Sequence, residues 1–418
     1  MELPMPPPPA ANGSSRKRKS SSAGGLGDLH DDMLERVLAR LPPSSCSRLR
    51  AVCRRWRAAA ASPTFLHACA RVPSRDPWFL MLSAASGPAV AFDAAESAWT
   101  RTRSADAAAP GSSVPVAASG GLVLYRAPAT GALSVTNPLT GASCALPSPP
   151  PPPNHHQLLA VAMYGAAPYR VAIFTGDLPD LSMAVFDSST NSWSPPVPLA
   201  RRMPNDASCP AAAAAAAAGD DDDDGTVYFL SKSGDVVSTN MQRSASKQYS
   251  SAVVPSPAGG AAVAYFLSNS GTVVACDTAR REYSELPRIL PVYSEYSVDV
   301  VACGGAAYAV VLAEYLDTAS LRVWEFAGAG AGEWRQVAAM PPAMSHGFRG
   351  RRADINCVGH GDRLMVCVSS GDGGGGGCFM CDVTTNRWEE LPEHVDGDGE
   401  VSEFLAAFSF EPRVEITV

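Results

Sequence analysis

Side chains that often do chemistry are present, but none of them falls in a pattern that builds a catalytic site. The seven histidines have few acidic neighbours, as in "NHHQ" and "MSHGF", and no serine stands in a G-x-S-x-G turn. The glycines of "GDGGGGG" lack the lysine and the following helix of a phosphate-binding loop. The sequence therefore predicts a protein that is not an enzyme and uses no cofactor.

Cysteine offers the remaining chemistry, which is metal binding or disulfide formation. Cys378 and Cys381 form a CxxC motif, but no second pair and no histidine cluster completes a zinc site. The eleven cysteines are odd in number and lie mostly in apolar, strand-like runs, which is typical of reduced core residues. We predict no metal site.

The length and composition are typical of a globular protein, and the charge is distributed unevenly along the chain. With 418 residues and 46% hydrophobic content, two or three domains are expected. No apolar signal segment opens the chain, and no run approaches the roughly 20 apolar residues of a membrane span, so we predict a soluble protein of the nucleus and/or cytoplasm without a membrane partner. Residues 1–75 hold 13 Lys/Arg against 5 Asp/Glu (net +8), and the remainder holds 20 against 36 (net −16). A basic N-terminal part suggests an acidic partner.

The first 75 residues contain a tail and a small helical module. Residues 1–25 are rich in Pro, Ser and Gly around the basic "RKRK", and this composition predicts a disordered basic tail. Helical periodicity then predicts three short helices within residues 26–71, the second of them capped by Ser44 or Ser45 and the third with Phe65 and Leu66 turned inward. About 40 residues rarely form a self-sufficient core, so apolar surface left over on this module predicts a partner.

A different unit recurs seven times over residues 77–418. It consists of an apolar strand, a glycine turn, a second strand and an Asp or Asn, followed by an aromatic residue and often by Leu-Pro. In four units the spacing is six residues: Asp93 to Trp99, Asp187 to Trp193, Asp277 to Tyr283 and Asp382 to Trp388. This repeat predicts four-stranded propeller blades, with the aspartate in the turn after the third strand and the aromatic residue between blades. We expect the final strand-like segment to pair with the first unit and close the ring.

The helical module resembles an F-box, and the repeats resemble kelch units. The F-box resemblance rests on Leu29, on "LERVLARLP" and on "RLRAVCRRWRAAAASPTF", although His30 stands where that family usually has proline. Together with "DPWFLML", "SVTNPLTG" and "FSFEPRVEI", the layout is similar to the Hawaiian Skirt type of plant F-box/kelch protein. The resemblance implies a mainly β protein with a three-helix F-box and a kelch-type propeller of six or seven blades. It further implies a substrate receptor of a Skp1–cullin–F-box (SCF) ubiquitin ligase.

Two groups of candidate binding residues follow. For the Skp1-like adaptor, and cullin beyond it, we predict a set of apolar residues on the first two helices: Leu34, Val37, Leu38, Leu41, Pro42, Leu49, Val52, Cys53 and Trp56. For the target protein, which we expect on one rim of the propeller, we predict residues of two arginine-bearing loops: Arg201, Arg202, Phe348, Arg349, Arg351 and Arg352.

Two alternatives stay open from the residues. The arginine-rich second helix, with "RKRK" as an anchor, would suit a nuclear nucleic-acid-binding protein, whose affinity would fall steeply with salt. A kelch scaffold without a ligase role would require the F-box pattern to be accidental. The apolar faces on both sides of Pro42 favour the adaptor.

Overall fold

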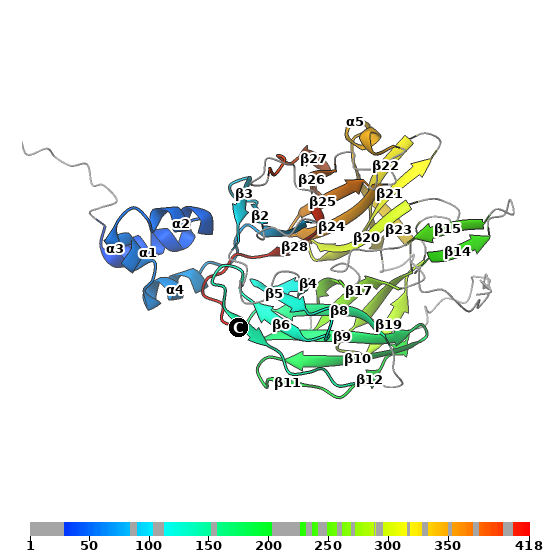
Figure 1. Ribbon diagram of the computed structural model, residues 1–418, viewed down its shortest axis with the longest axis horizontal. Helices are drawn as coiled ribbons and strands as arrows, with labels where there is room; N and C mark the ends of the chain where they lie inside the picture. The colour runs from blue at the N-terminus through cyan, green and yellow to red at the C-terminus, as the bar shows by residue number, and fades with distance from the viewer. Residues whose placement is uncertain are drawn as a thin grey trace, which may run out of the picture.

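The fold is a six-bladed β-propeller that carries a small helical module on one side (Figure 1). The computed structural model describes residues 29–83, 90–102, 113–151, 157–202, 226–230, 236–240, 249–256, 261–268, 272–287, 289, 296–315, 318–327, 333–349, 353–370, 376–395 and 404–418. The predicted tail at residues 1–25 lies outside these ranges. In the part of the chain so described, no helix has the length and apolar character needed to cross a membrane.

The helical module contains four helices where the sequence predicted three. They are α1 (Asp31–Arg40), α2 (Pro43–Leu49), α3 (Arg54–Ala59) and α4 (Pro63–Ala70). The expected second helix is interrupted because Cys53 is extended (φ −155°), and its Sγ accepts a hydrogen bond from the Trp56 amide at the start of α3. The predicted caps Ser44 and Ser45 make no cap bond, since Pro42 holds the N-cap position of α2.

Each of the six blades has four antiparallel strands, and the first strands of the blades line a central channel. The strands, from the channel outward, are as follows: blade 1, β28 (Phe404–Phe410), β1 (Trp78–Ser83), β2 (Val90–Asp93), β3 (Ala98–Arg101); blade 2, β4 (Val114–Ser119), β5 (Leu122–Arg126), β6 (Leu133–Thr136), β7 (Ser143–Ala145); blade 3, β8 (Leu158–Gly165), β9 (Tyr169–Asp177), β10 (Asp180–Asp187), β11 (Ser192–Trp193), with β12 (Val197–Pro198) also on β10; blade 4, β16 (Ala252–Pro255), β17 (Ala262–Leu267), β18 (Val273–Asp277), β19 (Glu282–Glu285), with β13 (Ala200–Arg201) parallel to β19; blade 5, β20 (Tyr296–Cys303), β21 (Ala306–Tyr315), β22 (Thr318–Ala327), β23 (Glu333–Ala339); blade 6, β24 (Ala353–His360), β25 (Arg363–Ser370), β26 (Gly377–Asp382), β27 (Arg387–Glu390).

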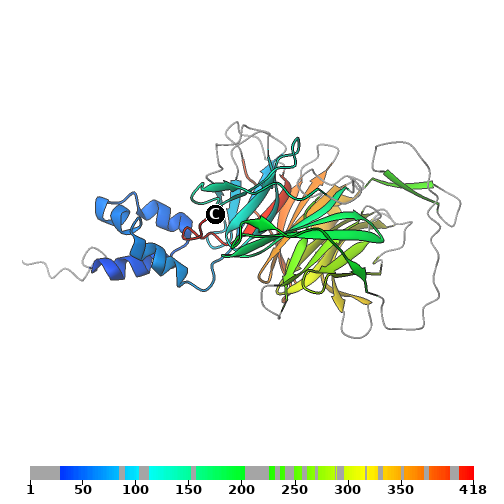
Figure 2. The ribbon, with the colours of Figure 1, turned by 90° about the horizontal axis from the view of Figure 1, so that it is seen from below.

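One of the seven predicted units is not a blade. Residues 226–240 form an isolated hairpin of β14 (Thr226–Leu230) and β15 (Val236–Asn240), inserted between blades 3 and 4. Figures 1 and 2 show this hairpin at the end of the molecule opposite the helical module. Two strands are too few for a blade, so the blade count is six.

The ring is closed as predicted. The last strand, β28, pairs with β1, with Trp78 opposite Phe410, so blade 1 combines the two ends of the propeller sequence. This pairing removes the open sheet edge that would otherwise remain. Connections between blades 5 and 6 include α5 (Pro342–Ser345) and the 3-10 turn η3 (His346–Phe348).

The repeated Asp and aromatic residues occupy the predicted places. Carboxylate or amide oxygens accept hydrogen bonds from backbone amides two or three residues ahead, in the turn after the third strand, at these positions: Asp93, Asn137, Asp187, Asp277 and Asp382. The aromatic side chains then reach the neighbouring blade, where three indoles donate to a proline carbonyl: Trp99 to Pro392 (2.8 Å), Trp193 to Pro147 (2.9 Å) and Trp334 to Pro287 (2.6 Å). The Leu-Pro that recurs in the sequence therefore supplies the acceptor that joins consecutive blades.

Each blade presents the turns after its first and third strands at the same end, because successive strands alternate in direction. In blade 1 this end holds Phe410 and the turn that follows Asp93, since both residues pair with Trp78. The helical module lies at this end, which we call the near rim, and we call the other end the far rim. The channel opens at the near rim into a cavity of about 490 Å³ lined mainly by small residues such as Ala118, Gly120 and Gly304.

Candidate functional site

The helical module has a core of its own. Leu34 and Leu38 of α1 are completely or almost completely buried, and they pack with Phe65 and Cys69 of α4. Ser62 caps α4 by accepting from the Phe65 amide (3.0 Å) and donates to Glu35 of α1 (2.6 Å). The first and last helices, α1 and α4, therefore form the centre of the module.

Apolar side chains on the outside of the module are its most unusual surface feature. Among the described residues, five large apolar side chains are strongly exposed, and four of them belong to this short segment. Met33 (48% exposed) and Val37 (37%) lie four residues apart on one face of α1, Val52 (65%) lies in the turn between α2 and α3, and Leu66 (40%) lies on α4. A module this small leaves apolar surface that its own chain does not cover.

The nine predicted adaptor residues divide into three environments. Leu34 and Leu38 are core residues, and Val37, Val52 and Cys53 are exposed. The remaining four are half-buried: Leu41, Pro42, Leu49 and Trp56. The half-buried leucines and the tryptophan pack against the core of the module, so they combine packing with some exposure.

Two exposed residues were missed by the sequence reasoning. Met33 stands four residues before Val37, so helical spacing already placed it on the same face. Leu66 was expected inside, and this was wrong, because the helix turns Phe65 inward and leaves the adjacent Leu66 outside. Neighbouring residues in a helix point about 100° apart, so only one of the two can face the core.

The module is attached to blade 1 through polar side chains of α2. The Ser44 hydroxyl donates to Asp93 (2.7 Å), and the Ser45 hydroxyl donates to Glu96 (2.6 Å). Arg48 forms an ion pair with the same Glu96 through Nη2 (2.6 and 2.5 Å to the two oxygens). The serines expected to cap a helix instead bind the turn after the third strand of blade 1.

This contact should depend on pH through Glu96. The Ser45 hydroxyl, which donates to the carboxylate, is the largest of the effects that lower the pKa of Glu96 below its ordinary value of 4.5. A lowered pKa in the folded state means that the stabilisation is present above the unfolded-state value and is lost as the pH falls through the folded-state value. We expect Glu96→Gln to lower the melting temperature near neutral pH, and we expect the difference from wild type to shrink and vanish as the pH falls through the lowered, folded-state pKa of Glu96. The exposed Glu393→Gln serves as the control, and a Glu96→Gln difference that does not change with pH would show that the ionised carboxylate is not what matters.

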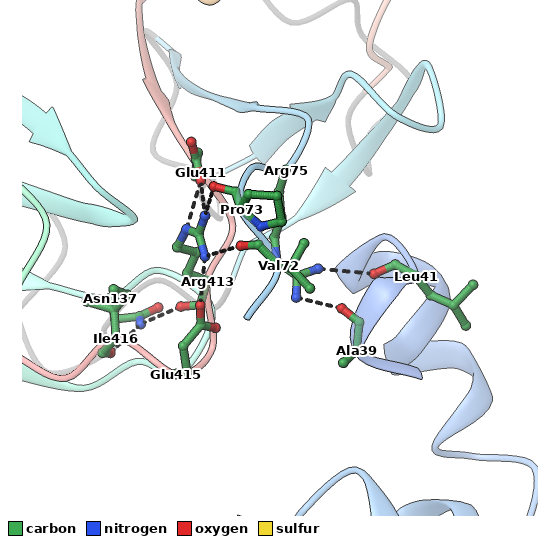
Figure 3. A network of polar contacts seen from close by, with 10 residues as sticks. All are labelled: Ala39, Leu41, Val72, Pro73, Arg75, Asn137, Glu411, Arg413, Glu415 and Ile416. Atoms are coloured by element: carbon green, nitrogen blue, oxygen red, sulfur yellow. Dashed lines mark hydrogen bonds and ion pairs between the residues drawn. The ribbon is translucent and has the colours of Figure 1, made fainter. Parts of the chain in front are cut away.

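The C-terminal segment forms a second attachment, which we call the C-terminal clamp (residues 411–416). The Arg413 guanidinium donates to the carbonyls of Val72 (3.1 Å) and Pro73 (3.0 Å), in the linker that follows α4. The same side chain pairs with Glu411 (2.7 Å) and Glu415 (3.0 Å), and it is only 12% exposed (Figure 3). One arginine therefore joins the end of the chain to the linker between the module and the propeller.

Contacts on both sides extend the C-terminal clamp. On the module side, Arg75 donates to the carbonyls of Ala39 (2.7 Å) and Leu41 (3.3 Å), and Val414 packs against the helical core. On the propeller side, the Asn137 amide of blade 2 donates to the Arg413 and Ile416 carbonyls (Figure 3). Figures 1 and 2 both show the C-terminal segment between the helices and the propeller.

The predicted target-binding residues do not form one site in the described structure. Arg201 lies on β13 at the outer edge of blade 4, where it pairs with Glu285 (3.0 Å), and Arg202 follows it. Phe348 is buried (7% exposed) and packs edge-to-face on Phe379, so it serves the core between blades 5 and 6. Arg349 is exposed beside it, at the far rim. Arg351 and Arg352 lie outside the described residues, and their role stays a prediction.

Comparison with known proteins now identifies the module. The F-box domain model matches residues 26–68, which cover all four helices except the last two residues of α4. F-box only protein 13 of Arabidopsis thaliana is 40% identical over 405 residues, which cover 94% of this chain and 86% of that protein. The chain belongs to the plant F-box proteins. The exposed apolar residues Met33, Val37, Val52 and Leu66 are therefore F-box residues.

Two further plant relatives are less similar to this chain or match less of it. F-box only protein 6 of Arabidopsis thaliana is 22% identical across 86% of this chain and 68% of that protein. Aberrant Panicle Organization 1 of Oryza sativa subsp. indica is 35% identical, but over only 28% of this chain and 29% of that protein. The assignment of the blades to the kelch class stays a prediction.

Proposed function

We propose that this F-box protein is the substrate-recognition subunit of a Skp1–cullin–F-box ubiquitin ligase. The F-box binds a Skp1-type adaptor and, through it, the cullin, while the propeller binds the protein that is to be ubiquitinated for proteasomal degradation. The observation that carries the proposal is the apolar surface of the F-box, where Met33, Val37, Val52 and Leu66 stay exposed although the module has its own core. Such surface is stabilised by a partner that covers it.

In this proposal the chain binds the target protein and positions it, and other subunits of the ligase transfer ubiquitin to it. Two attachments fix the F-box against the propeller, one from α2 to blade 1 and one through the C-terminal clamp. The near rim of blade 1 is occupied by the F-box, so we place the target on the far rim, where Arg349 lies. We expect the complex to act in the nucleus or the cytoplasm.

Titration of the full-length protein with a purified Skp1-type adaptor tests the proposal. An interface dominated by apolar contacts should give a dissociation constant that changes little with salt. Binding through phosphate contacts would instead weaken by roughly 10³-fold or more between about 50 and 200 mM salt. A parallel titration with duplex DNA serves as the control. Absence of adaptor binding, or tight salt-dependent binding of DNA, would contradict the receptor function and favour a nucleic-acid-binding protein.

A further inference from the structure

Two cysteine side chains face one another across the middle hairpin of blade 6. Cys367 of β25 and Cys378 of β26 are direct partners in the antiparallel register. Their sulfur atoms are 3.6 Å apart, with both groups present as thiols. The pair lies one position from the end of the ladder between the two strands.

The backbone at this position is compatible with a disulfide bond. Directly opposed residues of an antiparallel pair have Cα atoms about 4.5 or 5.5 Å apart, depending on the register. Disulfides span Cα separations of about 4.4 to 6.8 Å, so either register is suitable without movement of the strands. Small rotations of the two side chains would bring the sulfur atoms to bonding distance.

The CxxC motif noted in the sequence does not supply the partner of Cys378. Cys378 and Cys381 both lie on β26, three positions apart. Side chains an odd number of residues apart point to opposite faces of a strand. Cys381 accordingly packs in the core between blades 5 and 6, whereas Cys367 and Cys378 lie on the side of blade 6 that faces blade 1.

We propose that Cys367 and Cys378 are a redox modification site, at which a hydroperoxide forms a reversible cross-strand disulfide. Cys378 is half-buried and reachable, and Cys367 is 1% exposed, so Cys378 is the group that meets the oxidant. Its thiolate attacks one peroxide oxygen and the O–O bond breaks, giving a sulfenic acid and, after protonation, the water or alcohol released from the peroxide. Cys367 then attacks the sulfenic sulfur, the S–O bond breaks, and the oxygen leaves as water with the Cys367 proton. Both sulfurs are oxidised and the peroxide is reduced.

The location gives the bond a structural consequence. The Cys367 and Cys378 side chains belong to the cluster between blades 6 and 1, which also contains Phe79 and Met81 of β1 and Phe404 of the closing strand β28. A disulfide there fixes the end of the β25–β26 ladder beside the seam at which the propeller ring is closed. The bond would therefore stiffen the face of blade 6 that packs against blade 1.

Peptide mapping of the full-length protein tests the site. The protein is treated with hydrogen peroxide, its free thiols are alkylated, and it is digested without reductant by a protease that cleaves before aspartate. Because Asp362, Asp372 and Asp382 separate the cysteines, Cys367 lies in fragment 362–371 and the other two lie in fragment 372–381. We expect these two fragments to be joined, with Cys381 alkylated, and to separate after treatment with dithiothreitol.

Cysteine variants show whether the joined fragments are linked specifically through Cys378. Cys378→Ala should abolish the joined fragments, whereas Cys144→Ala, at an exposed cysteine of blade 2, should leave their yield unchanged. Wild-type protein in which Cys378 is oxidised or alkylated but the fragments remain separate would overturn the proposal. Linkage through Cys381 in place of Cys378 would overturn it as well.

Discussion

Replacing Val52 by glutamate should reduce capture of a Skp1-type adaptor by the full-length protein by at least about 30-fold, which corresponds to about 2 kcal/mol. Val52 is the most exposed large apolar residue described in the chain (65%), and it lies in a turn, where glutamate costs no helix propensity. A charge placed in an apolar interface must lose its hydration without gaining a partner. The measurement is calorimetric titration with the adaptor. The double substitution Met33→Glu and Val37→Glu on α1 should have an effect at least as large.

A matched control separates this effect from a general change in surface charge. Val395 is also apolar and exposed (52%), but it lies on the propeller beyond blade 6. Val395→Glu should leave adaptor affinity unchanged, and the melting temperatures of all three variants should stay close to wild type. Unchanged affinity in both F-box variants would remove the apolar face from the interface. Leu41 is less suitable for this test because it also packs against the core of the module.

The propeller was predictable because each blade carries the same short sequence pattern, and the pattern recurs along the chain. The spacing from Asp93 to Trp99, and its equivalents in other units, reflects a turn and an adjacent strand, both of which are local. The hairpin at residues 226–240 was wrongly counted as a blade because it has the apolar strand, the glycine turn, the second strand and the Asn (Asn240) that define the repeated unit. Eight alanines and five aspartates precede it, where the other units have the apolar sequence of a first strand.

The F-box helices show why periodicity can mislead in a small module. Leu49, Val52, Cys53 and Trp56 have the spacing of one helix, yet the chain turns between Leu49 and Arg54. Periodicity assumes that apolar residues face the core of their own chain. Val52 instead faces outward, so its helical spacing from Leu49 and Trp56 does not mean that it packs in the core with them.

The attachments between F-box and propeller could not have been predicted from the sequence. Arg413 contacts Val72, which is 341 residues away, and Ser45 contacts Glu96 across 51 residues. Serine, arginine and glutamate are common surface residues, and no local pattern specifies which distant partner each will meet. The Arg413 contact depends on the closed ring, which brings the C-terminal segment beside the start of the propeller.

Replacement of Arg413 by alanine should lower the free energy of unfolding by about 3 kcal/mol and should loosen the F-box from the propeller. The substitution leaves Glu415 (8% exposed) and Glu411 (23%) without the cation that pairs with them, and it removes the donors to the Val72 and Pro73 carbonyls. A largely buried charge that loses its partner is strongly destabilising. Urea unfolding measures the stability, and proteolysis of the linker at residues 72–76 measures the attachment.

Two further variants show whether the forked geometry of the Arg413 guanidinium is what stabilises the protein and its F-box attachment. Arg413→Lys keeps the charge but cannot reach two carboxylates and two carbonyls together, so its stability should fall between those of wild type and Arg413→Ala. Arg280→Ala, at an exposed arginine 3.8 Å from Asp277, should change stability by less than about 1 kcal/mol. If Arg413→Ala is as stable as Arg280→Ala and its linker is not cut faster, the C-terminal clamp does not hold the F-box in place. If Arg413→Ala still binds the adaptor with wild-type affinity, the clamp positions the F-box without forming part of the adaptor interface.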